Sequence, residues 1–71
     1  MDVYPNPVID KLLIKSSLEF IEFSVLDING RYIELTYDGN TIDFADTIPG
    51  VYLIIGITKD GKGYTTKVVK K

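Results

Sequence analysis

The 71-residue chain contains no cysteine, no histidine and no tryptophan. Without cysteine it cannot form a disulfide, and without cysteine and histidine it lacks the usual zinc ligands and the usual base that activates a nucleophile. It also lacks the side chain that most often moves protons near neutral pH. These absences exclude most enzyme mechanisms, so we expect no catalytic residue, no metal site and no cofactor.

Long apolar runs and an excess of positive charge are missing as well. The longest apolar run, Val51 to Ile55, is far shorter than the roughly 20 residues that cross a bilayer. Met1 is not followed by the basic and apolar segments of a secretory leader, so the chain alone is not expected to enter the general secretion pathway. The formal net charge of −2 lacks the basic footprint of a nucleic-acid binder. We expect no membrane span and no nucleic-acid partner.

Charge is unevenly distributed along the chain. Residues 1–50 hold three cations against nine acids, whereas residues 51–71 hold five lysines against Asp60 alone. The last third of the chain is therefore the basic part, and the part that we expect a partner to contact.

What the chain does contain is a regular series of turn signals about ten residues apart, a spacing typical of strands. On both sides of Asn29-Gly30, apolar residues alternate with polar ones, which predicts a hairpin over residues 20–37 closed by a type I′ turn. The alternating apolar residues are Ile21, Phe23, Val25, Ile33, Leu35 and Tyr37.

The rest of the chain extends this pattern. Residues 51–57 are nearly all apolar, which predicts a central strand buried on both faces. Asp60-Gly61 joins it to a final strand on which Thr65 and Lys67 face the solvent. The chain is thus expected to be one all-β domain, a small immunoglobulin-like Greek-key β-sandwich of six to seven antiparallel strands. The further predicted strands are residues 12–14, 41–44 and 64–69.

A helix competes with the first strand of the predicted hairpin. Ser16 and Glu19 have the spacing of a capping box, and apolar residues from Leu18 to Ile28 recur near the helical period. The helix would be short, however, and its aromatic and β-branched residues favour a strand. We therefore predict the strand.

Few side chains could carry chemistry. The three serines have no histidine to activate them. Four aspartates lie at or near predicted turns, where this residue is favoured for its backbone hydrogen bonds, and their spacing matches no calcium loop. A carboxylate enzyme and a calcium site remain minor alternatives. The four aspartates are Asp38, Asp43, Asp46 and Asp60.

Four short segments stand out in order along the chain. They are Tyr4-Pro5-Asn6-Pro7-Val8, Leu26-Asp27-Ile28-Asn29-Gly30-Arg31, Ile48-Pro49-Gly50-Val51-Tyr52-Leu53 and Lys67-Val68-Val69-Lys70-Lys71. Together they resemble the C-terminal sorting domain of the type IX (Por) secretion system of Bacteroidetes, over nearly the whole chain. The matching family positions are Tyr4, Pro5, Asn6, Pro7, Asp27, Gly30, Arg31, Gly50, Tyr52 and the Lys67 to Lys70 tail.

The resemblance implies an address rather than a catalyst. The domain would be the C-terminal end of a longer cargo protein, which passes through the periplasm and reaches the cell surface or the medium. Its partners would be the type IX translocon, an outer-membrane shuttle protein and a sortase that removes the domain. The sequence does not identify the cargo or its anchoring.

Elementary chemistry suggests a role for three of the four segments. Arg31 is expected to pair with Asp27 across the hairpin, and Tyr52 to bury its ring and donate its hydroxyl as in a tyrosine corner. The tail, residues 67–71, is expected to present cations and an unpaired strand edge to the translocon. We therefore expect removal of Lys70 and Lys71 to block export while leaving the fold intact.

The alternative from another class is an immunoglobulin-like spacer or a carbohydrate-binding module of a surface protein. Sugar sites usually need exposed aromatic platforms, and only Tyr4, Tyr32 and Tyr64 are candidates here.

Overall fold

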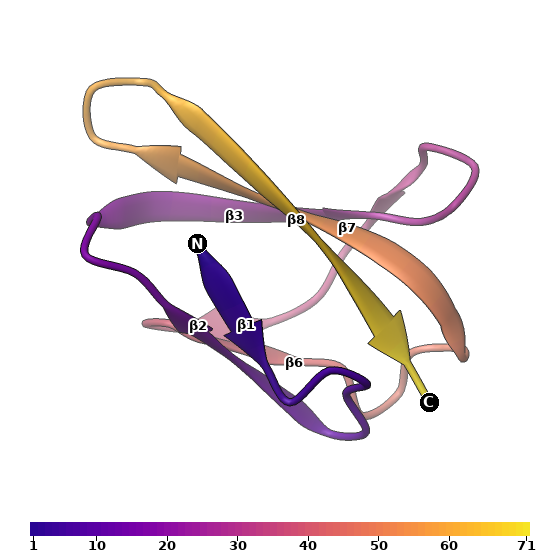
Figure 1. Ribbon diagram of the computed structural model, residues 1–71. Helices are drawn as coiled ribbons and strands as arrows, with labels where there is room; N and C mark the ends of the chain where they lie inside the picture. The colour runs from indigo at the N-terminus through magenta and orange to yellow at the C-terminus, as the bar shows by residue number, and fades with distance from the viewer.

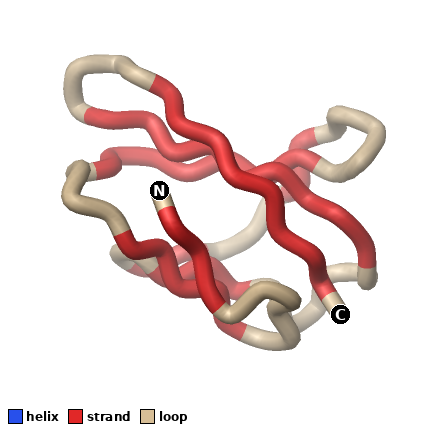
Figure 2. Tube along the Cα trace, in the orientation of Figure 1, coloured by secondary structure: helices blue, strands red, loops and turns tan.

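The computed structural model describes all 71 residues, and they form two stacked four-stranded sheets without a helix (Figure 1, Figure 2). The first sheet has the order β1-β2-β6-β5 and the second β4-β3-β7-β8, with every strand pair antiparallel. No helix is therefore present that could cross a membrane. The strands are β1 (Asp2–Tyr4), β2 (Lys11–Lys15), β3 (Phe20–Leu26), β4 (Tyr32–Ile33), β5 (Tyr37–Asp38), β6 (Thr41–Asp43), β7 (Gly50–Thr58) and β8 (Gly63–Lys70).

The predicted all-β sandwich is confirmed, with eight strands instead of six or seven. The returning strand predicted up to Tyr37 is divided, because residues 34–36 carry the chain from the second sheet to the first. The non-consecutive pairs β2–β6 and β3–β7 result from such crossings, which are typical of Greek-key sandwiches.

The core lies between the two sheets, where alternate residues of each strand meet. Leu12 and Ile14 face inward on β2, and Ile54 does so at the centre of β7. Fully burying an aliphatic or aromatic side chain stabilises the fold by about 1.5–3 kcal/mol. The buried hydrophobic residues are Val8, Leu12, Ile14, Phe23, Val25, Ile42, Phe44, Tyr52, Ile54 and Val68.

Two expectations about faces were wrong. β7 is buried on one face only, because no third layer covers the other, and Leu53 and Ile55 remain partly exposed there. Ile21 does not share the inward face of Phe23, because a register irregularity between Phe20 and Glu22 turns it outward.

The helical alternative around Ser16 is also excluded by the structure. Ser16 Oγ accepts a hydrogen bond from Leu18 N at 3.0 Å, but the residues that follow enter β3. The capping signal thus describes a local side-chain turn that precedes a strand.

Candidate functional site

The four sequence segments lie at the same end of the sandwich. This end comprises residues 4–10, 27–31, 45–52 and 67–71, and we call it the motif end; it is on the right in Figure 1, near the C-terminus. The opposite end carries the turns at residues 16–19, 39–40 and 59–62. Segments far apart in the sequence are thereby neighbours in space.

The Tyr4–Pro7 segment runs beside the tail. Asn6 Oδ1 accepts a hydrogen bond from Val69 N at 3.0 Å. Val8 N then donates to Val69 O at 2.8 Å, and Val8 O accepts from Lys71 N at 2.9 Å, so that Val8 forms a parallel bridge with Lys70. The peptide bonds that precede Pro5 and Pro7 are both cis. The first and last segments are therefore joined by side-chain and backbone hydrogen bonds.

The Asp27–Arg31 segment is a tight hairpin turn. Gly30 N donates to Asp27 O at 3.0 Å and Asp27 N donates to Arg31 O at 2.9 Å. Gly30 has a φ of 79°, whereas no non-glycine residue has a positive φ. The predicted type I′ turn, which needs a positive φ at Asn29 too, is therefore wrong. The hydrogen bonds indicate a three-residue loop in which glycine alone takes the left-handed position.

The Asp27 carboxylate holds this turn together. Its Oδ1 accepts hydrogen bonds from Asn29 N and Arg31 N, each at 2.9 Å. Its Oδ2 lies 3.4 Å from Arg31 Nε, so the predicted pair is present. These contacts, first among them the bond from Arg31 N, lower the pKa of Asp27. The aspartate thus serves its own turn, while the Arg31 side chain stays largely exposed.

Tyr52 has the environment predicted for it. Its ring is buried and meets Phe44 edge to face, with the ring centroids 5.8 Å apart. Its hydroxyl donates a hydrogen bond to the backbone oxygen of Ile48, four residues upstream. This is the tyrosine-corner arrangement, and it fixes the segment that leads into β7.

The tail alternates between two environments. Val68 is in the core, and Lys70 is only 7% exposed, with its Nζ donating to Thr47 O at 2.9 Å. Lys67, Val69 and Lys71 are exposed. These contacts argue against the expectation that removal of Lys70 and Lys71 leaves the fold intact, because Lys70 joins β8 to the loop that precedes β7.

The unpaired edge of β8 is also not where the sequence placed it. Asn6 and Val8 cover the backbone groups of Val69 and Lys71. A strand could not have been predicted to lose its edge in this way, because the contact joins residues that are 63 positions apart.

A surface hollow joins the second and third segments. A cavity of about 450 Å³ lies between the Asp27 turn and residues 48–52. Three of its lining side chains are strongly exposed apolar groups: Ile28 (79%), Ile48 (78%) and Tyr32 (75%). Sequence reasoning did not place Ile28 and Ile48 beside each other, because the two residues belong to separate turns. Exposed apolar side chains gathered around a hollow are typical of interaction surfaces.

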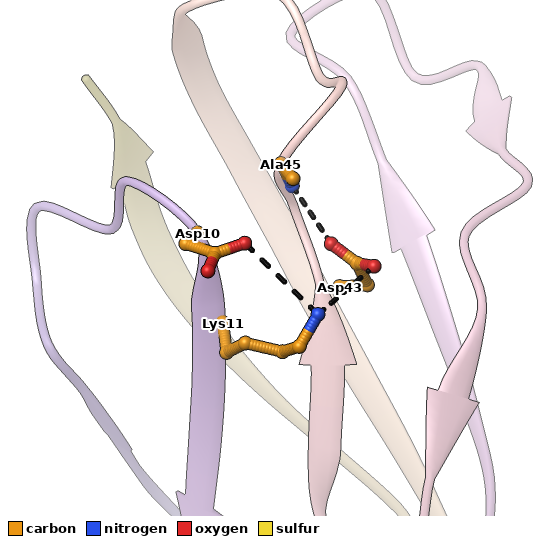
Figure 3. A network of polar contacts seen from close by, with 4 residues as sticks. All are labelled: Asp10, Lys11, Asp43 and Ala45. Carbon is orange, nitrogen blue, oxygen red and sulfur yellow. Dashed lines mark hydrogen bonds and ion pairs between the residues drawn. The ribbon is translucent and has the colours of Figure 1, made fainter.

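Asp43, one of the four candidate aspartates, makes structural contacts. Lys11 Nζ lies 3.1 Å from Asp43 Oδ2 and 4.0 Å from Asp10 Oδ1, and Asp43 Oδ1 accepts from Ala45 N at 2.9 Å (Figure 3). The bond from Ala45 and the Lys11 cation lower the pKa of Asp43, and the bond to Asp43 raises the pKa of Lys11. The pair links β2 to β6 across adjacent strands.

The other three candidate acids lie on different parts of the chain. Asp60 accepts a hydrogen bond from Thr58 Oγ1 within the β7–β8 turn. Asp38 lies on the short strand β5, and Asp46 lines a separate hollow together with Asp43. No group of three potential ligand side chains is placed to hold a metal ion.

The three tyrosines suggested for a sugar platform do not come together. Tyr4 is on β1 of the first sheet and Tyr32 on β4 of the second. Tyr64 packs against Phe20 edge to face, with the centroids 6.0 Å apart. The arrangement offers no shared aromatic surface for a carbohydrate.

Comparison with known protein families identifies a family that matches this chain. The family model described as the secretion system C-terminal sorting domain matches residues 2–71. A search of the curated proteins found no match, and a search of the solved structures found none either. Because the match spans nearly every residue of the sandwich, the chain belongs to the family of C-terminal sorting domains of the type IX secretion system.

Proposed function

We propose that residues 1–71 act as a single detachable sorting signal and not as an enzyme. Domains of this family direct export to the cell surface or the extracellular space. In our proposal, the attached cargo passes through the periplasm, the type IX translocon and an outer-membrane shuttle protein engage the domain, and a surface sortase then removes it.

The observation that carries this proposal is the contact between the four family segments at the motif end. Asn6 binds the tail, Lys70 binds the loop before β7, and a hollow joins that loop to the Asp27 turn. A partner that contacts this end meets all four segments at once. The exposed members Arg31, Lys67, Val69 and Lys71 are the side chains that we propose the translocon touches.

The test is export of a reporter. The 71 residues are fused to the C-terminus of a protein that otherwise stays in the periplasm of a bacterium with a type IX system. We expect the reporter outside the cell in the wild-type strain and in the periplasm of a translocon mutant. The same reporter without the domain is the control. Retention of the fusion in the periplasm of the wild-type strain would contradict the sorting function.

The mass of the exported reporter tests the removal step separately. A sortase that removes the domain leaves an extracellular reporter that is shorter by about the length of the fused chain. An exported reporter that keeps the whole domain would contradict removal while leaving the sorting function intact.

A further inference from the structure

The remaining free edge of β8 is a short segment with defined hydrogen-bonding groups. In an antiparallel pair, every second residue directs its backbone N–H and C=O away from the partner strand. Val69 does so, because Asn6 and Val8 bind its backbone groups from the side opposite β7. By this alternation, Gly63, Thr65 and Lys67 direct theirs to the same side.

Nothing in the structure pairs with these three residues. β8 is the last strand of its sheet, and the backbone hydrogen bonds made outside the sheets include none from Gly63, Thr65 or Lys67. The open edge thus covers residues 63–67 and is about 17 Å long at roughly 3.4 Å per residue. That length matches an ordinary strand of five residues. β8 is also the longest of the four strands that end the two sheets, since β1, β4 and β5 have three residues or fewer.

The charge on this edge indicates which strand it would accept. Residues 63–71 include three lysines and no acid, and Lys67 lies exposed on the open segment. No salt bridge involves Lys67. A second copy of the chain would bring a second basic edge, whereas a strand with carboxylates opposite Lys67 would neutralise it.

We propose that residues 63–67 accept an extended acidic segment of a partner protein as an added strand beside β8. Main-chain hydrogen bonds to Thr65 and Lys67 supply affinity in this mode, and the side chains of alternate residues supply specificity. The partner strand would end where Asn6 and Val8 already occupy the edge, which sets its register. This inference rests on the sorting function, because it names how an export component holds the domain.

Proline provides a sharp test. Proline is tolerated on an edge strand where its nitrogen faces solvent, but it cannot donate to an added strand. Thr65→Pro is therefore compared with Thr65→Ala, which keeps the N–H and loses the same hydroxyl. Lys67→Glu is compared with Lys67→Gln to test the charge. All four variants are made in the reporter fusion, and the thermal unfolding of each purified 71-residue chain is recorded.

We expect about tenfold less export for Thr65→Pro and for Lys67→Glu, as the loss of about 1.4 kcal/mol of binding would give. Thr65→Ala keeps the backbone N–H and should export several-fold more than Thr65→Pro, and Lys67→Gln should lie between the wild type and Lys67→Glu. Where Thr65→Pro prevents folding, the Lys67 pair decides the proposal.

The failures are distinguishable. Wild-type export with equal export of all folded variants overturns strand addition and leaves the sorting function standing. Reduced export of Thr65→Pro with unchanged export of Lys67→Glu overturns the acidic partner. Sedimentation that finds wild-type dimers but Thr65→Pro monomers makes a second copy the occupant. No export of the wild-type fusion overturns the sorting function itself.

Discussion

Asn6 and Val69 lie 63 positions apart in the chain, yet the side-chain oxygen of the first accepts a hydrogen bond from the backbone nitrogen of the second at 3.0 Å. This bond joins the first and last family segments and closes one end of the β8 edge. The asparagine between the two prolines thus has a structural role that the neighbouring sequence does not indicate.

Replacement of Asn6 by alanine should lower the free energy of unfolding by about 1 kcal/mol, because a backbone donor loses its partner. For a domain of this size, that corresponds to a fall of roughly 4–8 °C in Tm. Asn29→Ala is the matched control, since the Asn29 side chain makes no hydrogen bond in the structure. Equal melting temperatures for the two variants would show that the Asn6 bond contributes nothing.

Tyr52→Phe should cost about 1 kcal/mol, since it removes the hydroxyl that binds the Ile48 carbonyl while leaving the ring in the core. Tyr32→Phe removes the same group from a side chain that is 75% exposed and should leave stability unchanged. Urea denaturation of both variants measures the difference. A Tyr52→Phe protein as stable as the wild type would show that the hydrogen bond of the tyrosine corner does not stabilise the fold.

Alanine variants of two glycines of β7 distinguish an effect on core packing from an effect on partner recognition. A Cβ at Gly56 would lie 2.7 Å from Phe20 Cδ1, so Gly56→Ala should cost about 1–3 kcal/mol through overpacking. A Cβ at Gly50 would meet nothing closer than Tyr52 Cε2 at 3.9 Å, so Gly50→Ala should fold normally. A folded Gly50→Ala variant that fails in the reporter assay would place this family glycine in the contact with the partner. Marked destabilisation of Gly50→Ala would contradict the geometry.

Deletion of Lys70 and Lys71 should destabilise the domain by about 2 kcal/mol, because it removes the bond from Lys70 to Thr47 O and the bridge to Val8. Lys71→Ala keeps the backbone and should melt like the wild type. A truncated chain with an unchanged thermal transition would instead support the earlier expectation that this tail is free of the fold.

Acid should weaken the fold through Asp27 and Asp43, whose pKa values are lowered in the folded state. Because folding favours their ionised forms, their contribution is complete above the ordinary pKa of 3.8 and is lost as the pH falls through the lowered values. In the variant Asp27→Asn, the free energy of unfolding should fall less steeply as the pH is lowered. Denaturation series between neutral and low pH measure this dependence. Asp38→Asn, which removes a carboxylate that accepts no hydrogen bond, is the control. Its free energy of unfolding should depend on acid pH as that of the wild type does.

The raised pKa of Lys11 acts in the opposite direction. Its contribution is present below the ordinary value of 10.5 and is lost as the pH rises through the raised pKa. In Lys11→Met, the free energy of unfolding should therefore fall less at high pH than in the wild type. An unchanged fall would show that the Lys11–Asp43 ion pair does not stabilise the fold.

Local signals predicted the strands and several side-chain roles. The strand over residues 12–14, the glycine turn at Asp60-Gly61 and the buried Tyr52 ring all follow from short stretches of sequence, and the structure has each of them. The Asp27–Arg31 pair could be predicted because both residues belong to one hairpin.

Features that depend on distant residues could not be predicted in the same way. Lys70 resembles an exposed terminal cation until Thr47, which lies 23 positions away, is placed beside it. The outward position of Ile21 depends on the register between β3 and β7, which alternation alone does not specify. The hollow beside Ile28 and Ile48 exists only because two separate turns meet.

The bridge between Val8 and Lys70 also has a kinetic consequence. It closes a loop that contains almost the whole chain, and the pairs β2–β6 and β3–β7 likewise join distant residues. Chains dominated by such non-local pairings fold in milliseconds to seconds, because the entropy of loop closure is lost before the contacts form. The domain thus belongs among the slowly folding topologies, and the motif end is complete only after its first and last segments have met.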